Sequence, residues 1–274
     1  MRRRVAGRWI LLVLASLLLL GGVYAVAVLT PTGQSVEDGI LRSVDGSSLL
    51  RSGVALDAIS VPALGLAVLG LVAVALLRRR PAAAAQVVAI VAGATVTTQA
   101  LKVLVPRPEL TGDLYGNSFP SGHATIAVAL LFAAMTSFGR HVRPLAFVLG
   151  TVFAALVAEQ TVAYGWHRAS DVVGACAVAL FWLGLSRAVA TRYARDPHGG
   201  GLMGRRGYTV TSTLVGIAVV LCLTVSGAAW GIGIGMDMST TSASGDGVLV
   251  GARLAAAGIV LITAWLAWKL DGRR

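Results

Sequence analysis

Apolar residues along this chain are gathered into long runs, which short polar or basic segments separate. A run of about 20 residues is what an α-helix needs to cross about 30 Å of hydrocarbon at 1.5 Å per residue. Eight runs of roughly this length recur and predict an all-α, polytopic transmembrane helical bundle. The expected spans are Trp9–Leu29, Ile59–Leu77, Ala82–Leu101, His123–Phe138, Pro144–Ala163, Asp171–Ala190, Val210–Trp230 and Val248–Trp268.

The composition agrees with a membrane protein and argues against a soluble globular protein and against a nucleic-acid-binding protein. Of the 274 residues, 56% are hydrophobic and 13% are charged, which leaves too little polar surface to cover a soluble globule. The net charge of +11 does not indicate a nucleic-acid partner, because the basic residues alternate by loop instead of lining one face. Cys176 and Cys222 fall inside expected spans, where thiols act as small buried hydrophobes, so neither a disulfide nor a zinc site is predicted.

The placement of the basic residues predicts the orientation of the spans. They gather before the first span, after the second, fourth and sixth, and at the C-terminal end, and such segments face the cytoplasm. Both termini are therefore expected in the cytoplasm. Because Arg outnumbers Lys by 21 to 2, as in GC-rich bacteria, we expect a bacterial plasma membrane. The residues that carry this prediction are Arg2, Arg3, Arg4, Arg8, Arg78, Arg79, Arg80, Arg140, Arg143, Arg187, Arg192, Arg195, Arg205, Arg206, Lys269, Arg273 and Arg274, against Glu37, Asp38, Asp45, Asp57, Asp113, Asp237 and Asp246 on the other side.

The segments outside the spans predict three parts. Residues 1–195 hold six spans and every candidate motif, residues 196–207 form a Gly-rich cytoplasmic linker, and residues 208–274 form a two-span appendage. The outer loop Thr30–Ser60 has room for a short interfacial helix within Val36–Leu50, with a plain surface cap as the simpler interpretation. Gly231–Gly247 is expected to be a mobile outer loop. The first span is interpreted as an uncleaved anchor, because its apolar run is longer than a usual signal core.

Candidate chemistry begins with Ser121, Gly122 and His123, which follow Pro120 at the expected start of a helix. Ser121 can cap that helix, and Gly122 lets a ligand approach the backbone without a side chain in the way. A helix N-terminus of this kind binds anions through its free N–H groups. Simple capping beside a surface histidine is the alternative.

A second candidate pair is His167 and Asp171, which are four residues apart and share a helix face, so that the carboxylate can orient the imidazole. Such a pair also arises by chance, although an ionisable pair at the end of a membrane helix is costly and indicates function. Lys102 and Arg107 are basic residues on the otherwise acidic outer side. Both suit binding of phosphoryl oxygens, and both could instead be interface anchors.

These motifs resemble those of the type 2 phosphatidic acid phosphatase family. The family patterns are Lys, six residues, Arg-Pro; Pro-Ser-Gly-His; and Ser-Arg, five residues, His, three residues, Asp. The second is matched in full, and the third at His167 and Asp171, with Gln160 and Thr161 in place of Ser-Arg. The first is matched at Lys102, but Arg107-Pro108 comes two residues early, and Glu109-Leu110 stands where Arg-Pro is expected. The resemblance covers about residues 82–190.

The resemblance implies a mechanism that needs no metal or other cofactor. His167 would attack phosphorus and form a phosphohistidine, Asp171 would orient it, and His123 would protonate the leaving group. The phosphoryl oxygens would be held by Lys102, Arg107, Ser121 and Gly122. Arg168 is the first candidate to replace the arginine missing at Thr161, with an exposed interface anchor as its alternative role, and Arg42 or Arg51 are weaker candidates. Glu159 could pair with such an arginine, hydrogen-bond the site or simply reach water.

The function expected from these residues is hydrolysis of a lipid phosphate or a polyprenyl (di)phosphate on the outer membrane face, with membrane lipids as the surroundings. Phosphatidic acid, phosphatidylglycerol phosphate and polyprenyl diphosphate or polyprenyl-phosphoryl sugar phosphate are candidate substrates, and the motifs do not choose among them. The alternative is a catalytically weak or silent member that binds or moves phospholipid. A small-solute transporter would require the motif matches to be accidental.

Overall fold

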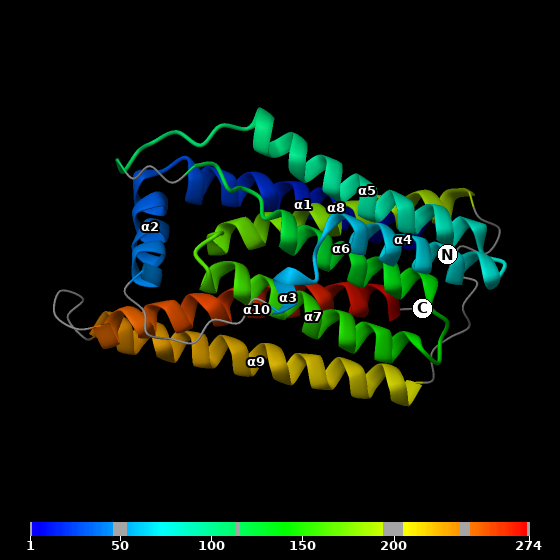
Figure 1. Cartoon of the computed structure of the whole chain (residues 1–274). Helices are drawn as coiled ribbons and strands as arrows, with labels where there is room; N and C mark the ends of the chain where they lie inside the picture. Colours follow the sequence, from blue (N-terminus) through cyan, green and yellow to red (C-terminus); the bar gives the residue numbers. More distant parts are fainter. Residues whose placement is uncertain (1, 46–53, 113–115, 194–204, 236–241, 273–274) are drawn as a thin grey trace.

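The computed structural model describes residues 2–45, 54–112, 116–193, 205–235 and 242–272, and within them every regular element is helical. The helices lie roughly along one direction, except α2, which stands across one end of the bundle (Figure 1). Their bounds are α1 Arg2–Val23, followed by a π-helical turn at Tyr24–Val28, α2 Pro31–Asp45, α3 Val54–Asp57, α4 Val61–Leu77, α5 Pro81–Leu104, α6 Gly122–Ser137, α7 Arg143–Ala163, α8 Ala169–Tyr193, α9 Arg205–Gly235 and α10 Ser242–Gly272. The all-α prediction is confirmed.

Each of the eight expected spans coincides with a helix, and six of these helices are long and apolar enough to cross a membrane. The other two, α4 with 17 residues and α6 with 16, are shorter than a usual span. The shortness of α6 agrees with its position, because most of its side chains are buried inside the bundle. Helix α6 is contacted by four other helices, α4, α5, α7 and α8. Its surface therefore packs against protein, whereas the surface of a peripheral span would face lipid.

The hydrophobic core runs the length of the bundle and includes α10. Phe132 of α6, Phe147 of α7 and Leu183 of α8 belong to the same buried cluster as Ala256 and Trp268 of α10. Helix α9 contacts α10 and, less extensively, α7, and its candidate span is mostly exposed. Thus α10 packs against α7 and α8 as a core helix does, whereas α9, among its described residues, contributes only Val215 to the buried cluster and packs along the outside of α10.

Charged residues reinforce this packing at the end of the bundle that carries both termini (Figure 1). Asp271, near the end of α10, is 5% exposed and pairs with Arg143 of α7. Arg187 of α8 also approaches it, with Nη2 at 3.4 Å from Oδ2, and donates a hydrogen bond to Gln86 of α5. Four helices therefore meet at one buried carboxylate and its neighbours.

The connections differ from the expected ones in two places. The interfacial helix expected within Val36–Leu50 begins earlier, at Pro31, and buries Ile40, Leu41 and Val44, while residues 46–53 lie outside the described part. The outer loop expected at Gly231–Gly247 is shorter, because α9 continues to Gly235 and α10 begins at Ser242. Once a long helix has formed, each added residue gains a hydrogen bond, so Gly and Ser at its ends do not stop it.

Most of the predicted linker, residues 196–204, lies outside the described residues, and the division into three parts stays a prediction.

Candidate active site

The start of α6 forms the first wall of the site. Ser121 has an extended backbone and caps the helix, its Oγ accepting a hydrogen bond from the Ala124 N–H at 3.4 Å. The Ser121 N–H donates to the carbonyl of Asp171 at 3.0 Å, which ties the start of α6 to the start of α8. The two motifs, which lie about 45 residues apart in sequence, therefore meet in space. A single anion site built from both motifs requires this proximity.

A close approach between a loop and α8 fixes this junction. A Cβ added at Gly174 of α8 would lie 2.7 Å from the ring of Phe119 and 3.0 Å from Pro120. Only glycine allows the loop before Ser121 to pack so closely on the helix. The Phe119 ring also contacts Tyr24, with ring centroids 5.6 Å apart. Packing thus helps to place the cap of α6, together with the hydrogen bond from Ser121 to Asp171.

His167 and Asp171 adopt the orienting geometry that their spacing predicts. Nδ1 of His167 lies 3.2 Å from Oδ2 of Asp171, whose side chain is fully buried. The same Oδ2 accepts hydrogen bonds from the Ser118 hydroxyl at 2.6 Å and from the Arg168 N–H at 3.0 Å. These donors fix the orientation of the carboxylate, and the carboxylate in turn fixes the orientation of the His167 ring through Nδ1. The other nitrogen, Nε2, makes no hydrogen bond with the described residues.

Lys102 and His123 lie beside the same helix start. A Cβ added at Gly122 would be 3.9 Å from Nζ of Lys102, so the ammonium group sits next to the first turn of α6. His123 is half-buried, lies within electrostatic range of both His167 and Lys102, and packs its ring 5.7 Å from that of Trp166. Two imidazoles, one ammonium and a helix N-terminus are therefore gathered at one place.

The loop that carries Arg107 is held by the π-helical turn after α1, by α2 and by the loop before α6. The Asn117 side chain donates to the carbonyls of Lys102 and Val105 at the end of α5. Gln34 of α2 donates to the carbonyl of Pro108 at 2.7 Å and accepts from the Leu110 N–H at 3.2 Å. Tyr24 also donates to the carbonyl of Pro106. Arg107 is thus placed by its backbone neighbours and by buried polar groups.

Two buried acids of α2 complete the site, and the sequence analysis did not identify them as site residues. Asp38 accepts from Nη2 and Nε of Arg168 at 2.8 and 3.2 Å, and the Arg168 Nη1 donates to Ser118. Glu37 accepts from the N–H of Ser170 at 3.1 Å and lies 3.7 Å from Nη2 of Arg107. The sequence signal was available, because both acids share a helix face with the buried Leu41 and Val44.

Burial shifts the pKa values of Glu37 and Arg107. Desolvation raises the pKa of Glu37, and a hydrogen bond from Ser170 opposes that rise. Desolvation and the neighbouring positive charge of Arg168 lower the pKa of Arg107. At 3.7 Å the contact between Arg107 and Glu37 is longer than a hydrogen bond, and Oε2 of Glu37 and both Nη atoms of Arg107 have no hydrogen-bond partner among the described residues.

The positions that depart from the family pattern have structural partners. Gln160 accepts from the N–H groups of Ala55 and Leu56 with its Oε1, which fixes α3 over α7. The carbonyl of Thr161 accepts from the His167 N–H at 3.2 Å, so this residue supports the loop before α8. Glu109 is exposed. None of these three side chains carries the positive charge that the arginines of the family pattern supply.

The other candidates for the missing arginine were Arg42 and Arg51. Arg42 is exposed on α2, and Arg51 lies outside the described residues. Glu159 pairs with Arg253 of α10, a partner that the sequence analysis did not consider. Among the described residues, no group of three or more His, Cys, Asp or Glu side chains is arranged to hold a metal ion.

Comparison with known proteins gives one match. The family model described as the PAP2 superfamily matches residues 63–195, a segment that contains Lys102, Arg107, His123, His167 and Asp171. No curated protein and no solved structure matches the chain. The matched segment extends from α4 to the end of α8 and contains neither Glu37 nor Asp38.

Proposed function

We propose that this protein is a membrane-embedded lipid phosphate phosphatase that works through a phosphohistidine. The proposal is supported by the match of residues 63–195 to the PAP2 superfamily, whose members generally hydrolyse phosphate esters. The observation that carries the proposal is His167, held by buried Asp171 through Nδ1, beside Lys102 and the open N-terminus of α6. Nucleophile, orienting group and anion-binding groups are then all supplied by the protein chain.

The reaction follows from this placement in two displacements. Nε2 of His167 attacks phosphorus, the bond from phosphorus to the leaving oxygen breaks, and His123 gives its proton to that oxygen. The Nδ1–H of the new phosphoimidazolium donates to Asp171, whose negative charge stabilises it. His123 then takes a proton from water, the hydroxide oxygen bonds to phosphorus, and the P–N bond breaks to release phosphate and restore His167.

The phosphoryl group is held by charge and by the helix start. Lys102, the backbone N–H groups at Ser121 and Gly122, and Arg107 carry this role, because they neutralise the charge on the transferring group. Arg107 has both Nη atoms available, since neither is hydrogen-bonded among the described residues. Arg168 adds its positive charge from beside His167, although its guanidinium donates hydrogen bonds to Asp38 and Ser118.

A lipid substrate is supported by the surface around the site. Val103 and Leu104, directly after Lys102, are 84% and 76% exposed, and Trp166 is half exposed beside His123. Apolar side chains next to a phosphate site suit a molecule with a buried tail and a charged headgroup. The charge pattern of the loops supports the outer face of a bacterial plasma membrane, opposite the cytoplasmic termini.

The second candidate is a silent member that binds phospholipid without turnover. It is favoured by Thr161, which supplies no cation, and by the engagement of Arg168 with Asp38. Removing one donor of this type commonly lowers a rate by about 100-fold or more. The two candidates share the site and differ only in whether phosphate is released.

The test is a phosphate-release assay on the purified chain with phosphatidic acid, phosphatidylglycerol phosphate and polyprenyl diphosphate. We expect release by the wild type and none by His167→Ala, while His141→Ala, which removes an exposed histidine outside the site, retains activity. Enzyme quenched during turnover with labelled substrate should carry acid-labile, base-stable phosphate that His167→Ala lacks. Binding of the lipids without release from any of them would establish the silent member instead.

A further inference from the structure

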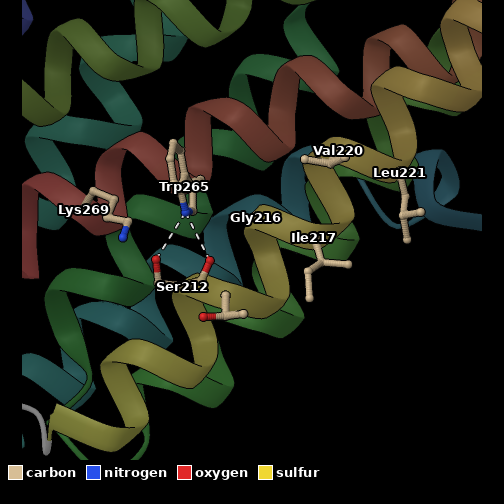
Figure 2. Close-up of a pocket in the computed structure, with 8 residues that line it drawn as sticks. Ser212, Gly216, Ile217, Val220, Leu221, Trp265 and Lys269 are labelled. Atoms are coloured by element: carbon tan, nitrogen blue, oxygen red, sulfur yellow. Dashed lines mark hydrogen bonds between the residues drawn. The ribbon is translucent and has the colours of Figure 1, made fainter.

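A groove between α9 and α10 lies far from the histidines, at the end of the bundle that carries the termini (Figures 1 and 2). It has a volume of about 430 Å³. Figure 2 shows Lys269, Trp265 and Ser212 at one end, with Ile217, Val220 and Leu221 following along α9. The groove therefore has a polar end and an apolar length.

The polar end presents one cation and two hydroxyl groups. Nζ of Lys269 lies 5.3 Å from the ring centre of Trp265 and 5.8 Å from that of Tyr208, so the ammonium is kept between two aromatic faces. Trp265 donates its Nε1–H to the carbonyl and hydroxyl oxygens of Ser212 at 3.1 and 3.2 Å, which leaves the Ser212 O–H able to donate. Thr213 adds a second hydroxyl to the lining.

No acidic side chain in the described part of the chain pairs with this ammonium. The nearest acid in sequence, Asp271, is engaged by Arg143 and Arg187. Lys269 therefore brings an unneutralised positive charge to a surface that also offers hydroxyl donors. Phosphate oxygens accept hydrogen bonds and carry the opposite charge, so a phosphate-bearing group is complementary to this end.

The remaining length of the groove fits a hydrocarbon chain. Ile217, Val220 and Leu221 are 52%, 60% and 58% exposed, and Gly216 leaves the floor open between them and Trp265. From Ser212 to Leu221 the helix advances about 13 Å at 1.5 Å per residue. This is close to the depth of about 15 Å that one leaflet contributes to the hydrocarbon core.

We propose that this groove is a binding site for an anionic diacyl phospholipid of the leaflet at the termini. Its phosphate is held by Lys269, Ser212 and Thr213, and one acyl chain lies along Ile217, Val220 and Leu221. Such a lipid would fill the open side of the α9–α10 pair. The site is separate from the one that contains His167, and the proposal does not depend on catalysis.

The experiment is native mass spectrometry of the full chain in neutral detergent, titrated with phosphatidylglycerol or with phosphatidylcholine of the same acyl chains. We expect the first phosphatidylglycerol to bind about fivefold more tightly, the factor that corresponds to about 1 kcal/mol for one basic residue at an anionic surface. Lys269→Gln should abolish this preference, whereas Lys269→Arg should keep it. Arg140→Gln, which removes an exposed cation from the same end, should also keep it.

A second variant tests the acyl-chain part. In Gly216→Leu the new Cβ would lie 3.7 Å from Nε1 of Trp265, an ordinary contact, so the side chain can fill the groove without moving the backbone. We expect weaker binding of both lipids. A preference for phosphatidylglycerol that survives Lys269→Gln, or that Arg140→Gln abolishes equally, would overturn the proposal. So would a dimer that Gly216→Leu dissociates with lipid binding unchanged, because a second copy would then cover the groove.

Discussion

Replacing Asp38 by alanine would remove the carboxylate that accepts two hydrogen bonds from Arg168. The two side chains are 2% and 3% exposed, so water cannot take over the lost contact. With about 4 Å between charge centres and an effective dielectric constant of about 20, the attraction between them is about 4 kcal/mol. Breaking one partner of a buried pair typically costs about 3–5 kcal/mol, because a buried charge loses its compensation. We expect Asp38→Ala to lower the free energy of unfolding by about 3–5 kcal/mol.

The assay is SDS-induced unfolding of the purified protein in mixed micelles, followed by circular dichroism. Asp57→Ala removes an exposed acid of α3 and should change the free energy of unfolding little. Asp38→Leu combined with Arg168→Met should recover most of the loss, since an apolar pair replaces two buried charges. The reasoning is refuted if Asp38→Ala costs less than about 1 kcal/mol, or if the double variant is as unstable as the single one.

Three further predictions concern the orienting carboxylate, the loop packing and the buried acid. Asp171→Asn should lower kcat on a lipid phosphate by about 10²–10⁴-fold with little change in KM, because the attacking imidazole loses its charged partner; an unchanged kcat would contradict this. Gly174→Ala should cost about 1–3 kcal/mol in unfolding free energy by pressing on Phe119, whereas Gly227→Ala, which meets no atom within 4 Å, should not. Burial raises the pKa of Glu37 above 4.5, so its folded form binds more protons than its unfolded form, and stability should fall as pH rises from 4.5 through the folded pKa. Glu37→Gln should remove that part of a stability profile, and an identical profile would count against the assignment.

The parts of the site that local spacing determines were predictable. His167 and Asp171 needed only a helix to share a face, and Ser121 needed only the stop signal of Pro120 to become a cap. The positions of the eight apolar runs were likewise fixed by length and hydropathy, including the 16 residues of α6. The hydrophobic pattern did not predict that α6 is surrounded by α4, α5, α7 and α8, because the pattern of one segment does not contain its packing.

The parts that depend on contacts between distant segments were missed. Glu37 and Asp38 were interpreted as acids of an outer loop, and only the packing of α2 across the bundle end brings them to Arg107 and Arg168. Glu159 was expected near the site or in water, yet its partner comes from α10, far along the sequence. Local spacing predicts pairs within one helix turn, and it has no access to partners that depend on tertiary packing.

The carboxylate of Asp271 has a consequence for how this protein is made. It lies near the end of the last helix, and it is the shared partner of Arg143 and Arg187, whose helices enter the membrane earlier during synthesis. Until α10 is inserted, both arginines lack this acid, and the seam between α7 and α8 lacks Ala256 and Trp268. Packing of the segment that holds the two histidines is therefore complete only once α10 has been inserted, after translation of residues 63–195 is over.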